Sequence, residues 1–368
     1  MTDVTYMRRA MELAELGHGW VSPNPMVGAV LVKDGVVIGE GYHRHYGGLH
    51  AERDALAHCT QSPEGATLYV TLEPCCHTGK QPPCTDAILE AGIRRVVVAS
   101  KDPNPLVAGK GIEKLRRGGV EVTEGVLEEE CNRQNEVFFH YIQSKQPFVV
   151  MKYAMTLDGK IAAYTGASKW ITGEAARMHV QEQRHRYTAI MVGVGTVLAD
   201  DPLLTCRLPE GKNPIRIICD TKLSTPLNAR VVKTAKRVPT ILATCSQDAE
   251  KIARFQAAGC SILSAAELDG HVDLKALMRQ LGEEQIDSIL LEGGGTLNWA
   301  ALSAGIVQKV QAYVAPKLLG GQAARTPVEG IGFASPGEAV QLVDSRILKL
   351  GDDFLIESEV SGNVYRNH

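Results

Sequence analysis

The stretch that decides the fold and the chemistry of the first half reads His50-Ala51-Glu52, then Pro74-Cys75-Cys76-His77, then Pro83-Cys84. A catalytic zinc site takes three ligands from the protein and keeps a fourth position open for water, whose pKa the metal lowers. His50, Cys75 and Cys84 are suited to be those ligands. Residues two apart on a helix point about 200° away from each other, so we expect Glu52 to stand beside the metal without binding it.

The spacing of the cysteines departs from the H-x-E…P-C-x-x-C signature of zinc deaminases, in which the glutamate moves protons. Eight residues separate Cys75 from Cys84, where that signature has two, and we interpret the run between them as a loop. Cys76 and His77 lie in this run and are alternative ligands. A structural zinc site with a fourth protein ligand is a further alternative, but it gives Glu52 no role. The pattern therefore favours catalytic zinc, with Glu52 as the proton shuttle.

Length and composition predict a two-domain cytoplasmic enzyme. The chain has 368 residues, 44% hydrophobic and 22% charged, and 36 glycines, which is typical of α/β enzymes. A net charge of −3 argues against a nucleic-acid partner, and no stretch resembles a membrane span or a signal peptide. The odd count of nine cysteines favours reduced thiols over a disulfide framework.

The periodicity of the first half predicts one mixed sheet covered by helices. Cys84 begins a predicted helix and Cys75 follows a predicted strand, so we expect both side chains to be thiolates. Lys33-Asp34-Gly35 predicts a hairpin between the first two strands. The predicted helices span 6–16, 50–58, 84–91, 111–117 and 127–144, and the predicted strands span 27–32, 36–42, 66–72, 94–100 and 120–126.

Lys145-Gln146-Pro147 is the predicted boundary, which divides the chain into domains 1–145 and 146–368. Beyond it strands and helices alternate again. Strand 288–292 runs into Gly293-Gly294-Gly295 and a helix at 296–304, an arrangement that lets backbone N–H groups approach a phosphate. A tight strand–helix turn without a ligand is the alternative. Loops are predicted at 155–160 and 193–201, strands at 148–155, 189–194, 215–220 and 238–244, and helices at 173–186, 249–258 and 274–282.

Several longer motifs make the chain resemble the bifunctional riboflavin-biosynthesis family, diaminohydroxyphosphoribosylaminopyrimidine deaminase/5-amino-6-(5-phosphoribosylamino)uracil reductase. The family usually has serine at Cys76 and an aliphatic residue at Arg53, and its usual cysteine spacing is the one seen here. The motifs of the first half are 22–30 (SPNPMVGAV), 50–52 (HAE), 69–75 (YVTLEPC) and 102–105 (DPNP). Those of the second half are 168–172 (SKWIT), 193–202 (GVGTVLADDP), 204–207 (LTCR) and 315–320 (APKLLG).

The resemblance implies an α/β fold with an N-terminal cytidine-deaminase-like three-layer domain and a C-terminal dihydrofolate-reductase-like domain. It implies that zinc hydroxide deaminates 2,5-diamino-6-ribosylamino-4(3H)-pyrimidinone 5′-phosphate in the first domain, with Glu52 moving the protons. Asn24 is then expected to hold the substrate, and Lys80, Asp102 and Asn104 are candidates for orienting its ribose and phosphate. For Lys80 the alternative is a solvated loop cation, and for the other two it is bonding within a turn.

The resemblance also implies that the second domain reduces the ribosyl group to ribityl with hydride from NADPH. Arg184 and Arg207 suit the substrate phosphate because guanidinium binds it through two hydrogen bonds. Lys152, Asp200 and Glu292 are candidates, not ranked by sequence, for supplying a proton. The expected cofactor contacts are Ala154, Trp170, Thr196, Asp200, Thr221, Gly294, Gly295, Thr296, Leu297, Asn298, Trp299 and Ala300. The expected substrate contacts are Lys152, Ser168, Arg184, Leu204, Arg207 and Glu292.

Two other classes of protein share part of this pattern. A nucleic-acid editing deaminase shares His50-x-Glu52 but predicts a basic flank and no reductase-like half. A binding protein with structural zinc predicts neither ammonia release nor nicotinamide oxidation. In a third alternative only one domain is active. The favoured interpretation has a small phosphorylated pyrimidine as substrate, no nucleic acid, no membrane and, by family resemblance, a homo-oligomer.

Overall fold

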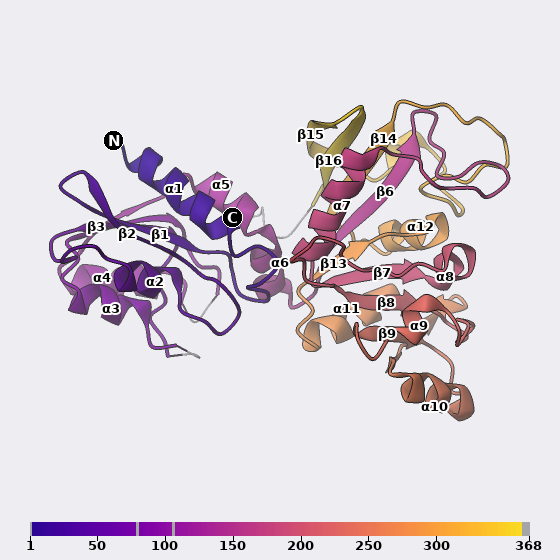
Figure 1. The fold of residues 1–368 in the computed structure, drawn as a ribbon, viewed down its shortest axis with the longest axis horizontal. Coiled ribbons are helices and arrows are strands. Elements are labelled where there is room, and N and C mark those ends of the chain that lie inside the picture. The colour runs from indigo at the N-terminus through magenta and orange to yellow at the C-terminus, as the bar shows by residue number, and fades with distance from the viewer. Residues whose placement is uncertain (1, 79–80, 105–106, 363–368) are drawn as a thin grey trace. The chain divides into compact units, whose positions relative to one another are not determined.

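The computed structural model describes residues 2–78, 81–104 and 107–362, and it divides into two compact units. Unit 1 is Met1–Ser144 and unit 2 is Lys145–His368, so the division lies beside the predicted boundary. Each unit has its own hydrophobic clusters, and Figure 1 shows the helices and strands of both units. Among the described residues, no helix is long and apolar enough to cross a bilayer.

Unit 1 is built on a mixed sheet with the strand order β2-β1-β3-β4-β5. β1 pairs with β2 and β3 in antiparallel fashion, and β4 pairs with β3 and β5 in parallel. The predicted hairpin at 33–35 is confirmed. The strands are β1 (Gly28–Lys33), β2 (Val36–Tyr42), β3 (Thr67–Leu72), β4 (Arg95–Ser100) and β5 (Glu121–Glu124), and the helices are α1 (Asp3–Glu15), α2 (Ala51–Ala57), α3 (Cys84–Glu90), α4 (Lys110–Arg117), α5 (Glu128–Gln134) and α6 (Glu136–Ser144).

Alternating side chains of the central strands bury both faces of this sheet, as expected for a three-layer unit. Ala29 and Leu31 of β1 pack with residues of α2, α3 and α4, whereas Val30 and Val32 pack with α1 and α5. Figure 1 shows these two groups of helices on opposite faces of the sheet. The carboxyl ends of β3 and β4, which are parallel neighbours, therefore open at one edge between the helix layers.

The predicted single helix at 127–144 is wrong, because the chain forms two helices that meet at Asn135. The side-chain amide of Asn135 accepts a hydrogen bond from the backbone N–H of Met26 and donates one to the Met26 carbonyl, both at 2.8 Å. Such side-chain bonds compete with helix continuation. A contact with a residue far away in sequence thus divides the helix.

Unit 2 contains a larger sheet with the order β10-β9-β8-β7-β13-β6-β14-β16-β15. The strands are β6 (Phe148–Thr156), β7 (Ala189–Gly193), β8 (Ile215–Cys219), β9 (Thr240–Thr244), β10 (Ser261–Ser264), β13 (Ser288–Leu291), β14 (Lys309–Ala315), β15 (Leu342–Leu350) and β16 (Asp353–Val360), with the two-stranded β11 (Glu267–Leu268) and β12 (His271–Val272) apart from them. The helices are α7 (Glu174–Arg186), α8 (Val194–Asp200), α9 (Arg230–Lys233), α10 (Ala249–Ala258), α11 (Leu274–Glu283), α12 (Gly295–Ser303) and the 3-10 turn Pro336–Glu338.

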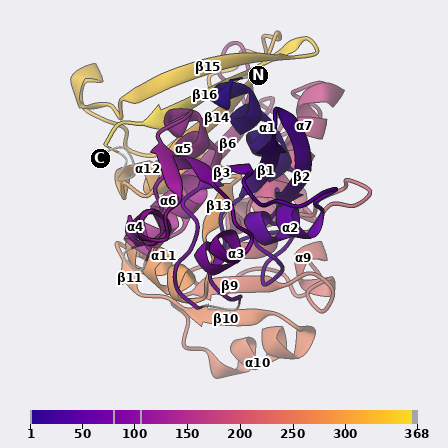
Figure 2. The ribbon, with the colours of Figure 1, turned by 90° about the vertical axis from the view of Figure 1, so that its left-hand side faces the viewer.

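The strands from β10 to β14 are parallel, and helices cover both faces of the sheet they form. α11 and α12 pack on one face, whereas α8, α9 and α10 pack on the other. The interpretation of 193–201 as a loop is wrong, because this segment forms α8, whose Val197 is buried in the core. The antiparallel pair β16 and β15 ends the sheet, with β15 outermost (Figure 2). The residues of β15 are exposed along most of its length.

Candidate functional site

The three predicted zinc ligands come together at the carboxyl end of β3. His50 directly precedes α2, Cys75 follows β3, and Cys84 begins α3. The Nδ1 atom of His50 lies 3.5 Å from Cys75 Sγ and 3.4 Å from Cys84 Sγ. Their ligand atoms all lie within 4.8 Å of one another, and neither Cys76 nor His77 belongs to this cluster.

The spacing of these atoms fits a zinc ion. Zinc bonds of about 2.3 Å to sulfur and 2.0–2.1 Å to nitrogen, set at tetrahedral angles, place the nitrogen and sulfur atoms roughly 3.5 Å apart. The cluster contains three side chains, and within the described residues no fourth one completes it. The donor set therefore fits a catalytic zinc site with a vacant position.

The surroundings of the two thiols shift their pKa values in opposite directions. A hydrogen bond from Cys84, and a further one from His50, lower the pKa of Cys75 to about 4. The same bond with Cys75, together with burial, raises the pKa of Cys84 well above its usual value. A bound zinc ion favours the ionised form of both sulfurs, because thiolates are its ligands, so the expectation of two thiolates in the zinc-bound protein stays a prediction.

Glu52 lies in the first turn of α2, where it is 3% exposed and shares a hydrogen bond with the Cys84 thiol. Burial, with a smaller contribution from Cys75, raises the pKa of Glu52 to about 6. A carboxyl group with a pKa near neutrality suits both the uptake and the release of a proton.

Arg53 holds the loop before Cys84. It stands at one of the two positions where the sequence departs from the usual family pattern, and its guanidinium donates to the carbonyls of Pro82 and Pro83.

A cavity of about 260 Å³ opens beside this cluster. It is lined by His50, Glu52 and Cys75 and by three predicted substrate contacts, Asn24, Asp102 and Asn104. Burial raises the pKa of Asp102 to about 6. The fourth predicted contact, Lys80, lies outside the described residues.

His43 and Glu73 are two of the cavity residues that were not predicted as site residues. His43 is buried, donates from Nδ1 to the Leu49 carbonyl, and lies 3.1 Å through Nε2 from the Asn24 amide nitrogen, so it orients Asn24. Burial lowers the pKa of His43. Glu73 is 3% exposed and accepts hydrogen bonds from backbone N–H groups of the segments beside Asp102. Glu73 lies within the family motif at 69–75, but nothing in the sequence shows its partners.

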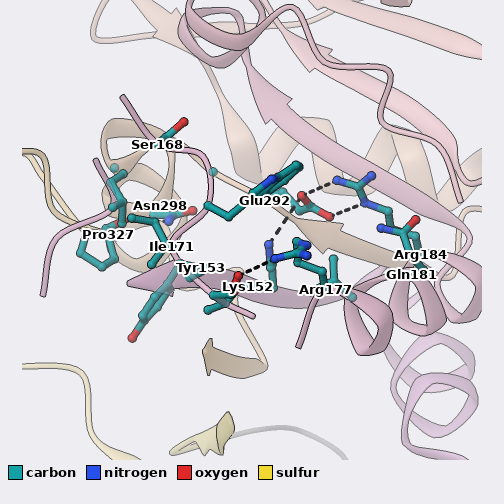
Figure 3. A pocket seen from close by; sticks show the side chains of 18 of the residues that line it. Lys152, Tyr153, Ser168, Ile171, Arg177, Gln181, Arg184, Glu292, Asn298 and Pro327 are labelled. Atoms are coloured by element: carbon teal, nitrogen blue, oxygen red, sulfur yellow. Dashed lines mark hydrogen bonds and ion pairs between the residues drawn. The ribbon is translucent and has the colours of Figure 1, made fainter. Parts of the chain in front are cut away.

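Unit 2 has a cavity of about 250 Å³ that contains a buried ion cluster (Figure 3). Glu292, which follows β13, accepts two hydrogen bonds of 2.8 Å from the Arg184 guanidinium of α7. The ammonium of Lys152 on β6 lies 3.8 Å from the same carboxylate. Burial alone would raise the pKa of Glu292, but Arg184 and Lys152 outweigh it and hold that pKa at about 2. Burial lowers the pKa of Lys152.

The structure brings some of the predicted reductase residues to this cavity and leaves others apart. Leu204 is buried in the core, Asp200 is exposed, and Trp299 lines a different cavity with Phe333. Thr196 accepts a hydrogen bond from the N–H of Gly294 and so lies next to the lining without forming it. Thr221, Thr296, Leu297 and Ala300 do not line the cavity. The predicted residues that line it are Lys152, Ala154, Ser168, Trp170, Arg184, Arg207, Glu292, Gly294, Gly295 and Asn298.

Sequence reasoning missed Arg177 and Lys317, which contact Trp170, and Gln181, which lines the cavity. The Arg177 guanidinium lies 4.7 Å from the centre of the Trp170 ring and donates to the Thr172 carbonyl. Lys317 donates to the carbonyls of Trp170 and Ile171. Gln181 accepts from the N–H of Arg207. Lys317 lies in the family motif at 315–320, which was a signal, whereas nothing in the sequence marks Arg177.

The glycine turn after β13 partly fits the predicted phosphate contact. Gly293 has φ +78°, which favours glycine, and a Cβ at Gly295 would lie 2.6 Å from the Glu329 side chain. Gly295 is thus required by packing, whereas a Cβ on Gly294 meets only the Thr196 hydroxyl, at 3.5 Å. Gly294 is therefore the glycine whose backbone lies open to a ligand.

Comparisons with known proteins cover both units. Residues 147–356 match the family described as RibD C-terminal domain, and residues 1–100 match the cytidine and deoxycytidylate deaminase zinc-binding region. The chain is 55% identical to riboflavin biosynthesis protein RibD of Actinobacillus pleuropneumoniae, over 97% of this chain and 95% of that protein. It is 41% identical to the Escherichia coli (strain K12) protein of the same name, over 88% and 90%.

Two solved structures are similar over nearly the whole chain. One is a diaminohydroxyphosphoribosylaminopyrimidine deaminase/5-amino-6-(5-phosphoribosylamino)uracil reductase from Thermotoga maritima, with a TM-score of 0.87 and 42% identity, covering 97% of this chain and 98% of that one. The other is form 1 of Acinetobacter baumannii RibD, with a TM-score of 0.87 and 36% identity, covering 98% and 99%.

Replacing one ligand of the cluster is expected to abolish stable zinc binding. In Cys84→Ser the ion loses one of three protein bonds, so zinc affinity should fall at least on the order of 100-fold. The measurement is zinc content by elemental analysis after dialysis against a chelator. Cys76→Ser is the matched control and should keep one zinc per chain. Zinc loss in the Cys76 variant, with zinc kept in the Cys84 variant, would make Cys76 the ligand.

Proposed function

Because the chain belongs to the RibD family of bifunctional deaminase/reductases of riboflavin biosynthesis, we propose that residues 1–145 carry the deaminase step and residues 146–368 the reductase step. The predicted fold classes are confirmed: a cytidine-deaminase-like domain with a mixed sheet precedes a dihydrofolate-reductase-like domain. The enzyme class and the need for zinc and a nicotinamide cofactor are likewise confirmed.

The observation that carries the deaminase assignment is the approach of His50, Cys75 and Cys84 to one another beside the buried Glu52. Zinc, when held by these three side chains, lowers the pKa of a water molecule so that it becomes a nucleophile at neutral pH. The substrate is 2,5-diamino-6-ribosylamino-4(3H)-pyrimidinone 5′-phosphate. Water oxygen adds to the carbon that carries the 2-amino group, and that amino group leaves as ammonia.

Glu52 moves the protons of this reaction. Its carboxylate takes a proton from the attacking water, gives it to the ring nitrogen, and assists the transfer of a proton to the departing amino group. Asn24, which His43 holds in place, is suited to contact the pyrimidine ring. Asp102 and Asn104 line the same cavity and are suited to the ribose or phosphate, as Lys80 is by family resemblance.

The reductase step is assigned to the cavity around Glu292. NADPH supplies a hydride when bound, and the backbone of Gly294 beside Thr196 is suited to its phosphates. The hydride adds to C1′ of the ribosyl group, the C1′–O4′ bond breaks, and O4′ takes one proton to give the ribityl chain.

We assign that proton to Lys152. Glu292 stays ionised because Arg184 and Lys152 neutralise it, so it is a poor acid at neutral pH. Asp200 is exposed and does not line the cavity. Lys152 lines the cavity, and its lowered pKa makes proton release easier than from a free lysine.

The substrate phosphate is assigned to Arg207 and Ser168. Arg184 already donates two hydrogen bonds to Glu292, so Arg207 and Ser168, which line the same cavity, are better placed to bind the phosphate.

The remaining assignments rest on the family and on composition. We place deamination before reduction, prefer NADPH to NADH, and expect a small phosphorylated substrate and no nucleic acid. A cytoplasmic location agrees with the nine free cysteines.

Glu52→Gln should retain zinc and lose deamination by at least about a thousandfold, because an amide cannot shuttle protons. Ammonia release and nicotinamide oxidation are to be followed separately, with the diaminopyrimidine substrate and with deaminated substrate plus NADPH. Reduction of the deaminated compound should be unchanged. Near-normal ammonia release from a variant that holds one zinc per chain would remove Glu52 from this role.

Lys152→Met should slow the single-turnover oxidation of bound NADPH by at least about 100-fold, since the proton donor is lost. Lys309→Met is the matched control: Lys309 is also buried and lies 3.6 Å from a carboxylate, that of Glu357, but does not line the cavity. Stopped-flow absorbance at the NADPH band measures both. A wild-type rate in Lys152→Met together with a lost step in Glu292→Gln would assign the acid to Glu292.

We propose that a second copy of the chain pairs along β15, which ends the sheet and exposes Leu342, Val343, Ile347 and Leu348. An exposed apolar edge strand is a template for pairing. Ile347→Lys should convert an oligomer to monomers in sedimentation velocity, whereas Ile331→Lys, outside β15, should not. A monomeric wild-type protein would refute this pairing.

A further inference from the structure

The carboxylate of Glu73 joins two parts of unit 1 that the deaminase reaction needs together. Glu73 follows β3 and stands two residues before Cys75. Its side chain is 3% exposed, and it accepts four hydrogen bonds from backbone N–H groups. None of these donors belongs to its own strand, so the carboxylate ties the metal-ligand segment to another part of the chain.

One of the four donors is the backbone N–H of Asp102, a proposed substrate contact, and the other three follow it at Gly109, Gly111 and Ile112. Oε2 accepts from the N–H of Asp102 at 3.3 Å and of Gly109 at 2.9 Å. Oε1 accepts from Gly111 at 2.9 Å and Ile112 at 3.2 Å, both in the first turn of α4. The Asp102 carboxylate in turn accepts from the N–H of Asn104 at 2.8 Å. A chain of hydrogen bonds thus runs from Glu73 to both cavity residues.

Gly111 packs so closely against the Glu73–Pro74 segment that no side chain larger than hydrogen fits at this position. A Cβ on Gly111 would lie 2.1 Å from the Pro74 carbonyl oxygen and 3.2 Å from Glu73 Oε1. The backbone next to Cys75 therefore packs directly on the start of α4. Replacing the Glu73 carboxylate by a neutral group would leave the buried N–H groups with a weaker acceptor, which would lower the stability of this junction.

We infer that Glu73 is a positioning residue of the deaminase, which sets the distance between the zinc cluster and the substrate-binding residues Asp102 and Asn104. Glu73 acts through the backbone N–H groups that it binds, and it is not a member of the His50, Cys75 and Cys84 cluster. The inference rests on the proposed substrate contact by Asp102. An error of about 1 Å in such a position lowers catalytic efficiency by as much as about 100-fold.

The test is a double-mutant cycle with Glu73→Gln and Asp102→Asn, with deaminase KM and kcat measured on the whole chain. Each single variant should raise KM at least about tenfold and change kcat less than about threefold, and the double variant should be no worse than the poorer single one. Glu73→Asp keeps both oxygens with a shorter reach, so its KM should lie between those of the wild type and Glu73→Gln. Zinc content and the reductase reaction of the same chain should stay unchanged.

Each of the following outcomes would overturn the inference and would show which of its steps is wrong. If Asp102→Asn has wild-type KM, the substrate contact itself is wrong. If the effects of the two variants multiply, Glu73 does not act through Asp102. If Glu73→Gln loses zinc together with kcat, the carboxylate supports the metal ligands instead, and if Glu73→Gln behaves as wild type, the carboxylate has no role in positioning.

Discussion

Parallel pairing of neighbouring strands is the constraint on which both sites depend. β3 and β4 run in parallel, so Cys75 and Asp102, which follow their carboxyl ends, meet at one edge of the sheet. In unit 2, β13 lies between β7 and β6 with the same direction, and Glu292 and the glycine turn follow its carboxyl end. Ligands bind at this edge of open α/β sheets because the loops there can vary in sequence while the strands hold the ends of these loops in place.

Both sites also contain buried ionisable groups, and the free-energy cost of burying their charge is offset in a different way at each site. Around the zinc cluster, hydrogen bonds from Cys84 and His50 lower the pKa of the Cys75 thiol, which favours a thiolate that can bind a cation. Around Glu292, a permanent carboxylate is neutralised by Arg184 and Lys152. Removing one partner of such a group leaves an uncompensated buried charge, which is strongly destabilising. Both arrangements are therefore expected to tolerate few substitutions.

The sequence could predict what depends on local pattern. The ligand set follows from residue type and spacing, and most helices and strands follow from periodicity and turn residues, within a few positions at their ends. The family motifs contain most residues that line the cavity of unit 1, but only a minority of those that line the cavity of unit 2. Contacts between distant segments could not be predicted in this way. Asn135 breaks a predicted helix by bonding to Met26, and Arg184, expected at a phosphate, is bound by a carboxylate of another element.

Leu204 is a second example of a residue whose surroundings could not be predicted from the sequence. Its motif suggested a substrate contact, yet its side chain packs in the core beside Ile190 and Val192. Leu204 is buried and does not line the cavity. Motif membership thus predicts that a position matters, but which of its atoms faces the site depends on the packing of α8 and β7.

The ion cluster of unit 2 has a consequence for inhibitor design. An acidic group introduced opposite Arg184 would compete with Glu292, an internal anion that is already held by two short hydrogen bonds. Such a compound would gain little from that arginine while placing a second negative charge beside the first. Compounds that present a neutral group at this point, and direct their acidic group toward Arg207 instead, avoid this competition.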